Sequence, residues 1–225
     1  MLFCCLVVLH NSSAQSSVPT ELRGFELGRH CTQLQPAIEQ NRQAGIALYP
    51  AASGERHCEI NKETGGLNKP ILGRMQQGRY KEIIWTDFSE TGRLGNISVD
   101  TVWFENAISD SPSVDILVNG LIKEYGAPSA YSQSESTQHG FFSPEMFTTN
   151  STYMAWTSTP DTTETGTSTL VIEEFSRFTK RVPNTLLIAV VSTSKSAETK
   201  SVALKLTLSD ARVFRDAPSP TIKLR

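Results

Sequence analysis

Residues 111–126 read SPSVDILVNGLIKEYG, and this stretch carries the clearest secondary-structure signal of the chain. Its apolar side chains recur three or four residues apart, which places them along one side of an α-helix. Ser111 is expected to cap the amino end with Pro112 in the first helical position, and Gly126 to end the helix. The apolar stripe consists of Val114, Leu117, Val118, Leu121, Ile122 and Tyr125. We therefore predict a helix that packs this stripe onto a core.

A second helix is predicted nearer the amino terminus. Thr32 and Gln35 have the spacing of a capping box, and Gly45 follows the helix where a terminating glycine is favoured. Its apolar face consists of Leu34, Ala37 and Ile38. Short strands are expected around it, over residues 22–27, 46–49 and 57–60.

Most of the remaining sequence has the pattern of β-strands. Residues 80–88 and 97–105 predict a hairpin, since a polar, glycine-containing segment joins them. Four further strands are expected, over residues 153–158, 169–175, 185–192 and 201–208. Short polar connections favour antiparallel pairing, and the order strand, helix, strands occurs twice without a strict sequence repeat. We predict an α+β domain, an antiparallel sheet with two main helices packed on one face.

The first fourteen residues are typical of a secretory signal. An apolar run over 2–9 is followed by small and polar residues up to Ala14, after which we place the cleavage. No Lys or Arg precedes the run, and a buried amino-terminal strand is the alternative. The prediction leaves residues 15–225 as a single domain and places it in the periplasm or outside the cell.

Two cysteines lie in the predicted domain, each in the same tripeptide: Arg29-His30-Cys31 and Arg56-His57-Cys58. A Cys31–Cys58 disulfide fits an oxidising compartment. A zinc site with both His residues is the alternative, but adjacent residues on a strand point to opposite faces and zinc ligands are normally spaced further apart. We favour the disulfide and expect no metal or other cofactor.

Composition excludes several classes of protein. The 225 residues contain 21 Lys and Arg against 23 Asp and Glu, a net charge of −2. The basic residues near the carboxyl terminus lack interleaved aromatic residues, so we expect no nucleic-acid partner. No run of 18 apolar residues occurs, so we expect no membrane-spanning helix.

Sequence motifs of catalysis are absent. The chain contains no G-x-S-x-G, H-E-x-x-H or phosphate-binding glycine loop. His139 in a predicted loop is the best candidate for a general base, and a hydrolase triad around it is the alternative function, because triads assemble in space rather than in sequence.

Aromatic residues give the more informative candidates for binding. The segment from Phe141 to Phe147 is apolar without helical or strand periodicity, which predicts either packing beneath the sheet or an interaction surface. Trp85, Trp103 and Trp156 fall in predicted strands, where core packing and a partner or carbohydrate surface are the two interpretations. The binding residues we predict are Phe141, Phe142, Met146, Phe147 and Trp156.

Two segments support a resemblance. Gly24-Phe25-Glu26-Leu27-Gly28 and Tyr125-Gly126-Ala127-Pro128 resemble small exported bacterial proteins of uncharacterised function, in which a G-x-x-L-G strand end precedes a helix and a later helix ends in Y-G-x-P. The chain is more loosely similar to envelope-assembly lipoproteins, whose lipid-bearing cysteine it lacks, and to inhibitor-type modules. The resemblance implies export and an α+β fold. We expect a non-catalytic binding module of the bacterial envelope, with an assembly, inhibitor or immunity-type role and a protein or envelope component as partner.

Overall fold

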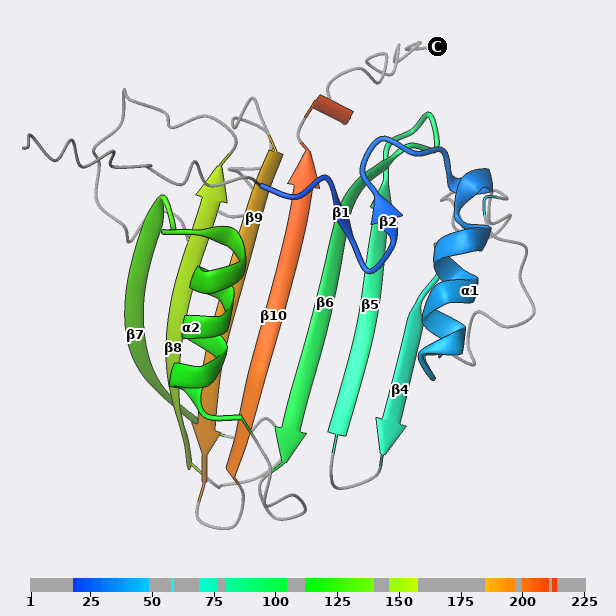
Figure 1. Ribbon diagram of the computed structural model, residues 1–225. Helices are drawn as coiled ribbons and strands as arrows, with labels where there is room; N and C mark the ends of the chain where they lie inside the picture. Colours follow the sequence, from blue (N-terminus) through cyan, green and yellow to red (C-terminus); the bar gives the residue numbers. More distant parts are fainter. Residues whose placement is uncertain are drawn as a thin grey trace, which may run out of the picture.

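The computed structural model describes residues 18–48, 58, 69–76, 80–104, 112–139, 146–157, 185–196, 200–210 and 212–213. Within these ranges, eight strands form one antiparallel sheet in the order β3-β4-β5-β6-β10-β9-β8-β7 (Figure 1). The strands are β3 (Ala47–Leu48), β4 (Leu72–Gln76), β5 (Tyr80–Phe88), β6 (Leu94–Phe104), β7 (Ala130–His139), β8 (Met146–Thr157), β9 (Thr185–Lys195) and β10 (Lys200–Asp210). The predicted antiparallel sheet is confirmed, although strands dominate and the fold is largely β.

The strand order is symmetric about the centre of the sheet, where β6 and β10 meet. In each half, a helix precedes four strands that pair with their neighbours in chain order. The last strands of the two halves, β6 and β10, pair antiparallel over nine residue pairs from Ser201↔Phe104 to Ser209↔Asn96. Two helix-and-meander units therefore share one continuous sheet.

One hydrophobic core connects both helices with one face of the sheet. Helix α1 (Gln35–Gln43) and helix α2 (Val114–Tyr125) both lie in front of the sheet in Figure 1. Their buried side chains belong to the same core as those of alternate strand positions. One row across the sheet contains Leu72, Ile84, Val99, Leu206, Ala189 and Met154.

Helix α2 forms as predicted at its carboxyl end and begins later than predicted. Its N-cap is Ser113, whose Oγ accepts a hydrogen bond from the backbone N–H of Ile116 at 3.3 Å. The predicted cap, Ser111, is wrong because Ser113 is the serine whose oxygen reaches the third helical N–H. Gly126 ends the helix at φ 80°. Leu121 is 6% exposed, and the rest of the predicted stripe packs against the same core.

The segment before α1 corrects two predictions. Residues 22–27 do not form one strand, because a two-residue turn at Arg23 and Gly24 divides them between β1 (Glu21–Leu22) and β2 (Phe25–Glu26). Arg23 and Gly24 adopt φ 56° and 80°, which reverses the chain. The capping box is formed by His30, the N-cap of a 3₁₀ helix over Cys31–Gln33, and by Gln33 within that helix, and not by Thr32 and Gln35.

The sequence pattern predicted the central strands and missed the polar ones. Strand β5 has the predicted bounds, and β6 begins at Leu94 because a short turn replaces the predicted long connection. Strands β4 and β7 were missed; β7 is an edge strand with mostly exposed polar side chains, so no apolar alternation marks it. The strand predicted over 169–175 lies outside the described residues.

Candidate binding groove between the helices

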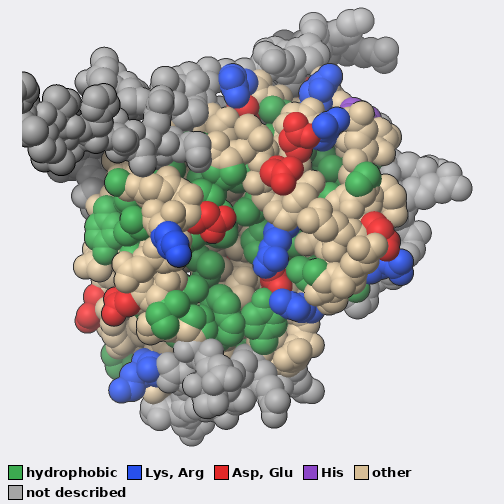
Figure 2. Space-filling model, viewed as in Figure 1, with side chains coloured by type: hydrophobic (Ala, Val, Ile, Leu, Met, Phe, Trp, Pro, Cys, Tyr) green, Lys and Arg blue, Asp and Glu red, His purple; other side chains and the backbone are tan. Residues whose placement is uncertain are grey.

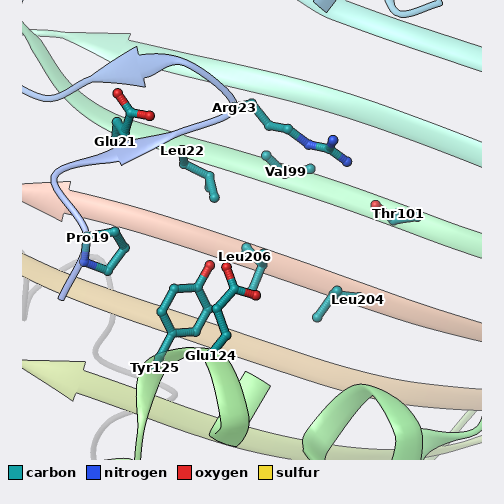
Figure 3. Close-up of a pocket in the computed structure, with 10 residues that line it drawn as sticks. All are labelled: Pro19, Glu21, Leu22, Arg23, Val99, Thr101, Glu124, Tyr125, Leu204 and Leu206. Carbon is teal, nitrogen blue, oxygen red and sulfur yellow. The ribbon is translucent and has the colours of Figure 1, made fainter. Parts of the chain in front are cut away.

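A groove with a volume of about 540 Å³ lies on the helix-bearing face of the sheet. It is bounded by the β1–β2 hairpin on one side and the carboxyl end of α2 on the other, over β6 and β10 (Figure 3). Because α1 and α2 cover the two flanks of the sheet, the central strands remain accessible between them. Figure 2 shows apolar side chains gathered in the middle of this face.

The floor of the groove is formed by two cross-strand pairs. Val99 lies opposite Leu206, and Thr101 lies opposite Leu204. Both leucines are only partly buried, although they pack against the core. The floor therefore exposes apolar area in a concave site, which is the usual basis of ligand affinity.

A buried carboxylate lies beside this floor. Glu82 is fully buried on β5, directly opposite Thr101. Its Oε1 accepts from Arg23 Nη2 at 2.5 Å, and its Oε2 accepts from Tyr80 Oη at 2.8 Å and Arg74 Nε at 3.1 Å. Such a carboxylate is stable in the interior because two cations and a hydroxyl satisfy it.

Tyr80 and Arg74 are also bonded to each other. Arg74 Nη2 donates to Tyr80 Oη at 3.1 Å, and this bond raises the pKa of Arg74. Burial raises the pKa of Tyr80, so its hydroxyl remains a donor to Glu82. The cluster thus fixes the side chain of Arg23, which lines the groove.

The position of Arg23 depends on its own backbone. Asn41, 3% exposed on α1, donates from Nδ2 to the carbonyl oxygen of Arg23 at 2.8 Å. Gly24 follows at φ 80°, and a Cβ there would lie 2.3 Å from Gln40 Oε1. The positive φ favours glycine at this position, because a residue with a Cβ would be strained in this backbone conformation.

The opposite wall of the groove is formed by the last turn of α2. Burial and the neighbouring Glu124 carboxylate raise the pKa of Tyr125 to about 12. The Tyr125 ring packs edge-to-face on Trp156, with centroids 5.6 Å apart. Trp156 Nε1 donates to the carbonyl oxygen of Gly126 at 3.0 Å, which fastens this end of the helix to β8.

Two carboxylates lie on the rim of the groove, Glu21 and Glu124. Neither forms an ion pair with another described residue. Both are exposed and line the groove, one from each side (Figure 3). Arg23, the lining cation, is already paired with Glu82. The lining residues include no Cys or His. The arrangement is suited to binding an apolar group that is followed by a cation.

The predicted disulfide is confirmed. Cys31 and Cys58 are bonded, with their Cα atoms 5.6 Å apart. Among the described residues, no group of three His, Cys, Asp or Glu side chains is placed to hold a metal ion. His57 of the alternative zinc site lies outside those residues.

The predicted aromatic binding residues are separated by the structure. Trp156 is 0% exposed, so it is a core residue and not part of a surface. Met146 is 56% exposed and Phe147 is half-buried at the start of β8. Phe141 and Phe142 lie outside the described residues, so the interaction surface around them stays a prediction.

His139 does not lie in a loop as predicted. It is the last residue of β7, where it pairs in register with Met146. The segment is a strand because it completes a ten-residue ladder with β8, a long-range pairing that no local pattern reveals.

The sequence did not single out the groove residues Arg23 and Glu124 or the buried Glu82 beside them. One signal was available for Glu82, because in strand 80–88 it shares a face with the buried Ile84 and Thr86. A carboxylate on a buried face needs a partner. The identity of its partners required the tertiary structure.

Comparison of the chain with protein-family models, curated proteins and solved structures finds no match. None of the described helices is long and apolar enough to cross a membrane.

Proposed function

We propose that the protein is an exported, non-catalytic binding module of the bacterial cell envelope, which holds an amphipathic segment of a partner protein in the groove between its helices. The observation that carries the proposal is the apolar floor of Leu204 and Leu206 beneath two rim carboxylates, Glu21 and Glu124, that form no ion pair with another described residue. The partner segment places an apolar side chain on the floor and a Lys or Arg beside Glu21 or Glu124. An assembly, inhibitor or immunity-type role is compatible with such binding.

Export is supported by two separate features. The apolar run and small residues of the first fourteen positions are typical of a secretory signal. The Cys31–Cys58 disulfide is of a kind that persists in oxidising compartments. We therefore propose a periplasmic or secreted location. No observation on the described residues favours the alternative of a hydrolase centred on His139.

Site-specific photo-crosslinking in the native host tests the proposal. A photoreactive residue at position 204 or 21 lies in the groove, and one at the exposed Glu135 of β7 is the matched control. We expect the groove positions to form a covalent adduct with one protein that the control position does not form. Equal labelling from all three positions would contradict a specific groove.

The second step uses the identified partner in purified form. Changing Glu21→Gln and Glu124→Gln together is expected to lower its affinity about 5-fold at low salt, since each exposed ion pair contributes modestly. Glu135→Gln is expected to have no effect. The proposed cationic contact is wrong if the double variant binds as tightly as the parent protein.

A further inference from the structure

A second site lies on the opposite face of the sheet. Ile84 faces the core beneath the helices, so its neighbour Trp85 points to the helix-free face. Trp85 is 45% exposed and lines a hollow of about 690 Å³ on strands β5, β6 and β10. This volume is within the usual range for small-molecule sites. An indole exposed in a concave site offers a flat apolar surface to a ligand.

Unpaired hydrogen-bond acceptors line the same hollow. Asn96 Oδ1 and Asp100 Oδ1 are buried atoms without a hydrogen-bond partner. The two residues lie on the same face of β6, four positions apart, with Ser98 between them. Buried acceptors of this kind are rare because each costs free energy unless something donates to it. They therefore indicate a ligand with several donors.

The charges of the hollow are already balanced within the protein. Lys69 forms an ion pair with Asp87. Lys205 Nζ lies 3.7 Å from Asp100 Oδ1, within ion-pair distance but beyond a hydrogen bond. Because two cations oppose two carboxylates, the hollow has no net charge to attract an ion. A ligand that fits this hollow is therefore uncharged and rich in hydroxyl groups.

We propose that this hollow is a binding site for a neutral saccharide. One sugar ring stacks its C–H groups on the indole face of Trp85. The face of an aromatic ring carries partial negative charge, which attracts the partly positive hydrogen atoms of the sugar. Its hydroxyl groups bond to the polar side chains that line the hollow, as donors to Asn96 and Asp100 and as acceptors from Lys205. The site is separate from the groove, since it lies on the other face of the sheet, and the proposal does not depend on the groove function.

Calorimetric titration of the purified disulfide-bonded protein tests this proposal with three neutral probes: cellotetraose, maltotetraose and tetra-N-acetylchitotetraose. We expect saturable binding of at least one probe, and a shift of the Trp85 indole N–H signal in NMR spectra during the titration. The proposal is wrong if the folded protein binds none of the three.

Two variants assign the binding to this hollow. Trp85→Ala is expected to weaken the affinity at least about 10-fold, as for an aromatic anchor. Asn96→Leu keeps the length and branching of the side chain and removes its acceptor, so we expect about 5-fold weaker binding with an unchanged or higher unfolding temperature. If Asn96 had a purely structural role, the variant would bind the saccharide as tightly as the parent protein and would have a lower unfolding temperature.

Tyr131→Ala is the matched control, because Tyr131 is 47% exposed but lies on β7, away from the hollow. It should bind the saccharide as the parent protein does. Unchanged binding by a folded Trp85→Ala variant would overturn the proposed site.

Discussion

The half of the sheet around α1 and the half around α2 contain the same order of elements and are stabilised by different interactions. Helix α1 has 9 residues, and the outer strands of its half, β3 and β4, have 2 and 5 residues. Helix α2 has 12 residues, and its half contains strands of 10 to 12 residues. The α2 half therefore has long ladders on which a helix can bury an apolar stripe.

The α1 half compensates for its shorter strands with specific polar and covalent links. Cys31 N–H donates to Gly92 O at 2.8 Å, which ties the 3₁₀ turn to the β5–β6 turn. The disulfide joins the same cysteine to Cys58. Buried Asn41 and Glu82 hold the β1–β2 hairpin. Apolar packing therefore stabilises the half with long strands, whereas the half with short elements depends on individual hydrogen bonds, ion pairs and a disulfide.

The largest expected effect is the loss of apolar packing in the α2 half. Leu121→Asp places a carboxylate without a partner in the core, and we expect a loss of about 4 kcal/mol or more in the free energy of unfolding. Chemical denaturation followed by circular dichroism measures this loss. Lys123→Ala, on the exposed side of the same helix, is the control and should change stability by less than about 0.5 kcal/mol. A cooperative, unshifted transition for Leu121→Asp would show that α2 does not stabilise its half by packing.

A somewhat smaller effect is expected from the covalent link of the α1 half. The disulfide closes a loop with a sequence separation of 27 residues. Its removal by Cys31→Ser with Cys58→Ser should lower the free energy of unfolding by about 3–4 kcal/mol in the chain-entropy model. Reduced parent protein should show the same loss in denaturation curves. If the double variant is as stable as the oxidised protein, the α1 half does not depend on its disulfide.

The smallest effect concerns the boundary between the halves, where Tyr125 faces the groove. The folded protein raises the pKa of this hydroxyl to about 12 from an ordinary value of about 10. The folded state then holds the proton more tightly than the unfolded state does. The resulting stabilisation is complete below about pH 10 and is lost as the pH rises towards about 12.

Tyr125→Phe should therefore remove part of the alkaline loss of stability between about pH 10 and 12. The remainder is expected to include Tyr80, whose pKa is also raised. Urea denaturation curves across this pH range measure the effect, with Tyr131→Phe as a control at an exposed position. If Tyr125→Phe and the parent protein show the same pH dependence, the Tyr125 hydroxyl is not buried between α2 and the sheet.

Elements with strong local patterns could be predicted from the amino-acid sequence. The stripe from Val114 to Tyr125 and the glycine at 126 placed α2, since helical periodicity and capping are properties of neighbouring residues. Alternation placed β5, most of β6 and the core of β9 and β10. The Cys31–Cys58 disulfide was predicted because these are the two cysteines of a domain that the sequence led us to expect outside the reducing cytosol.

Features that depend on contacts between residues distant in sequence could not be predicted in this way. Strand β7 exists because it pairs with β8, and its polar residues show no periodicity. Trp156 lies in the core instead of on a surface because Tyr125 and Gly126 cover it. The groove and the Trp85 hollow lie on opposite faces of the β6–β10 pair, which joins residues distant in the chain. Ser98 and Thr207, for example, are hydrogen-bonded across 109 positions of sequence. Local sequence patterns show which side of a helix or strand is apolar. The way in which the two halves join sets which surfaces of the sheet remain uncovered.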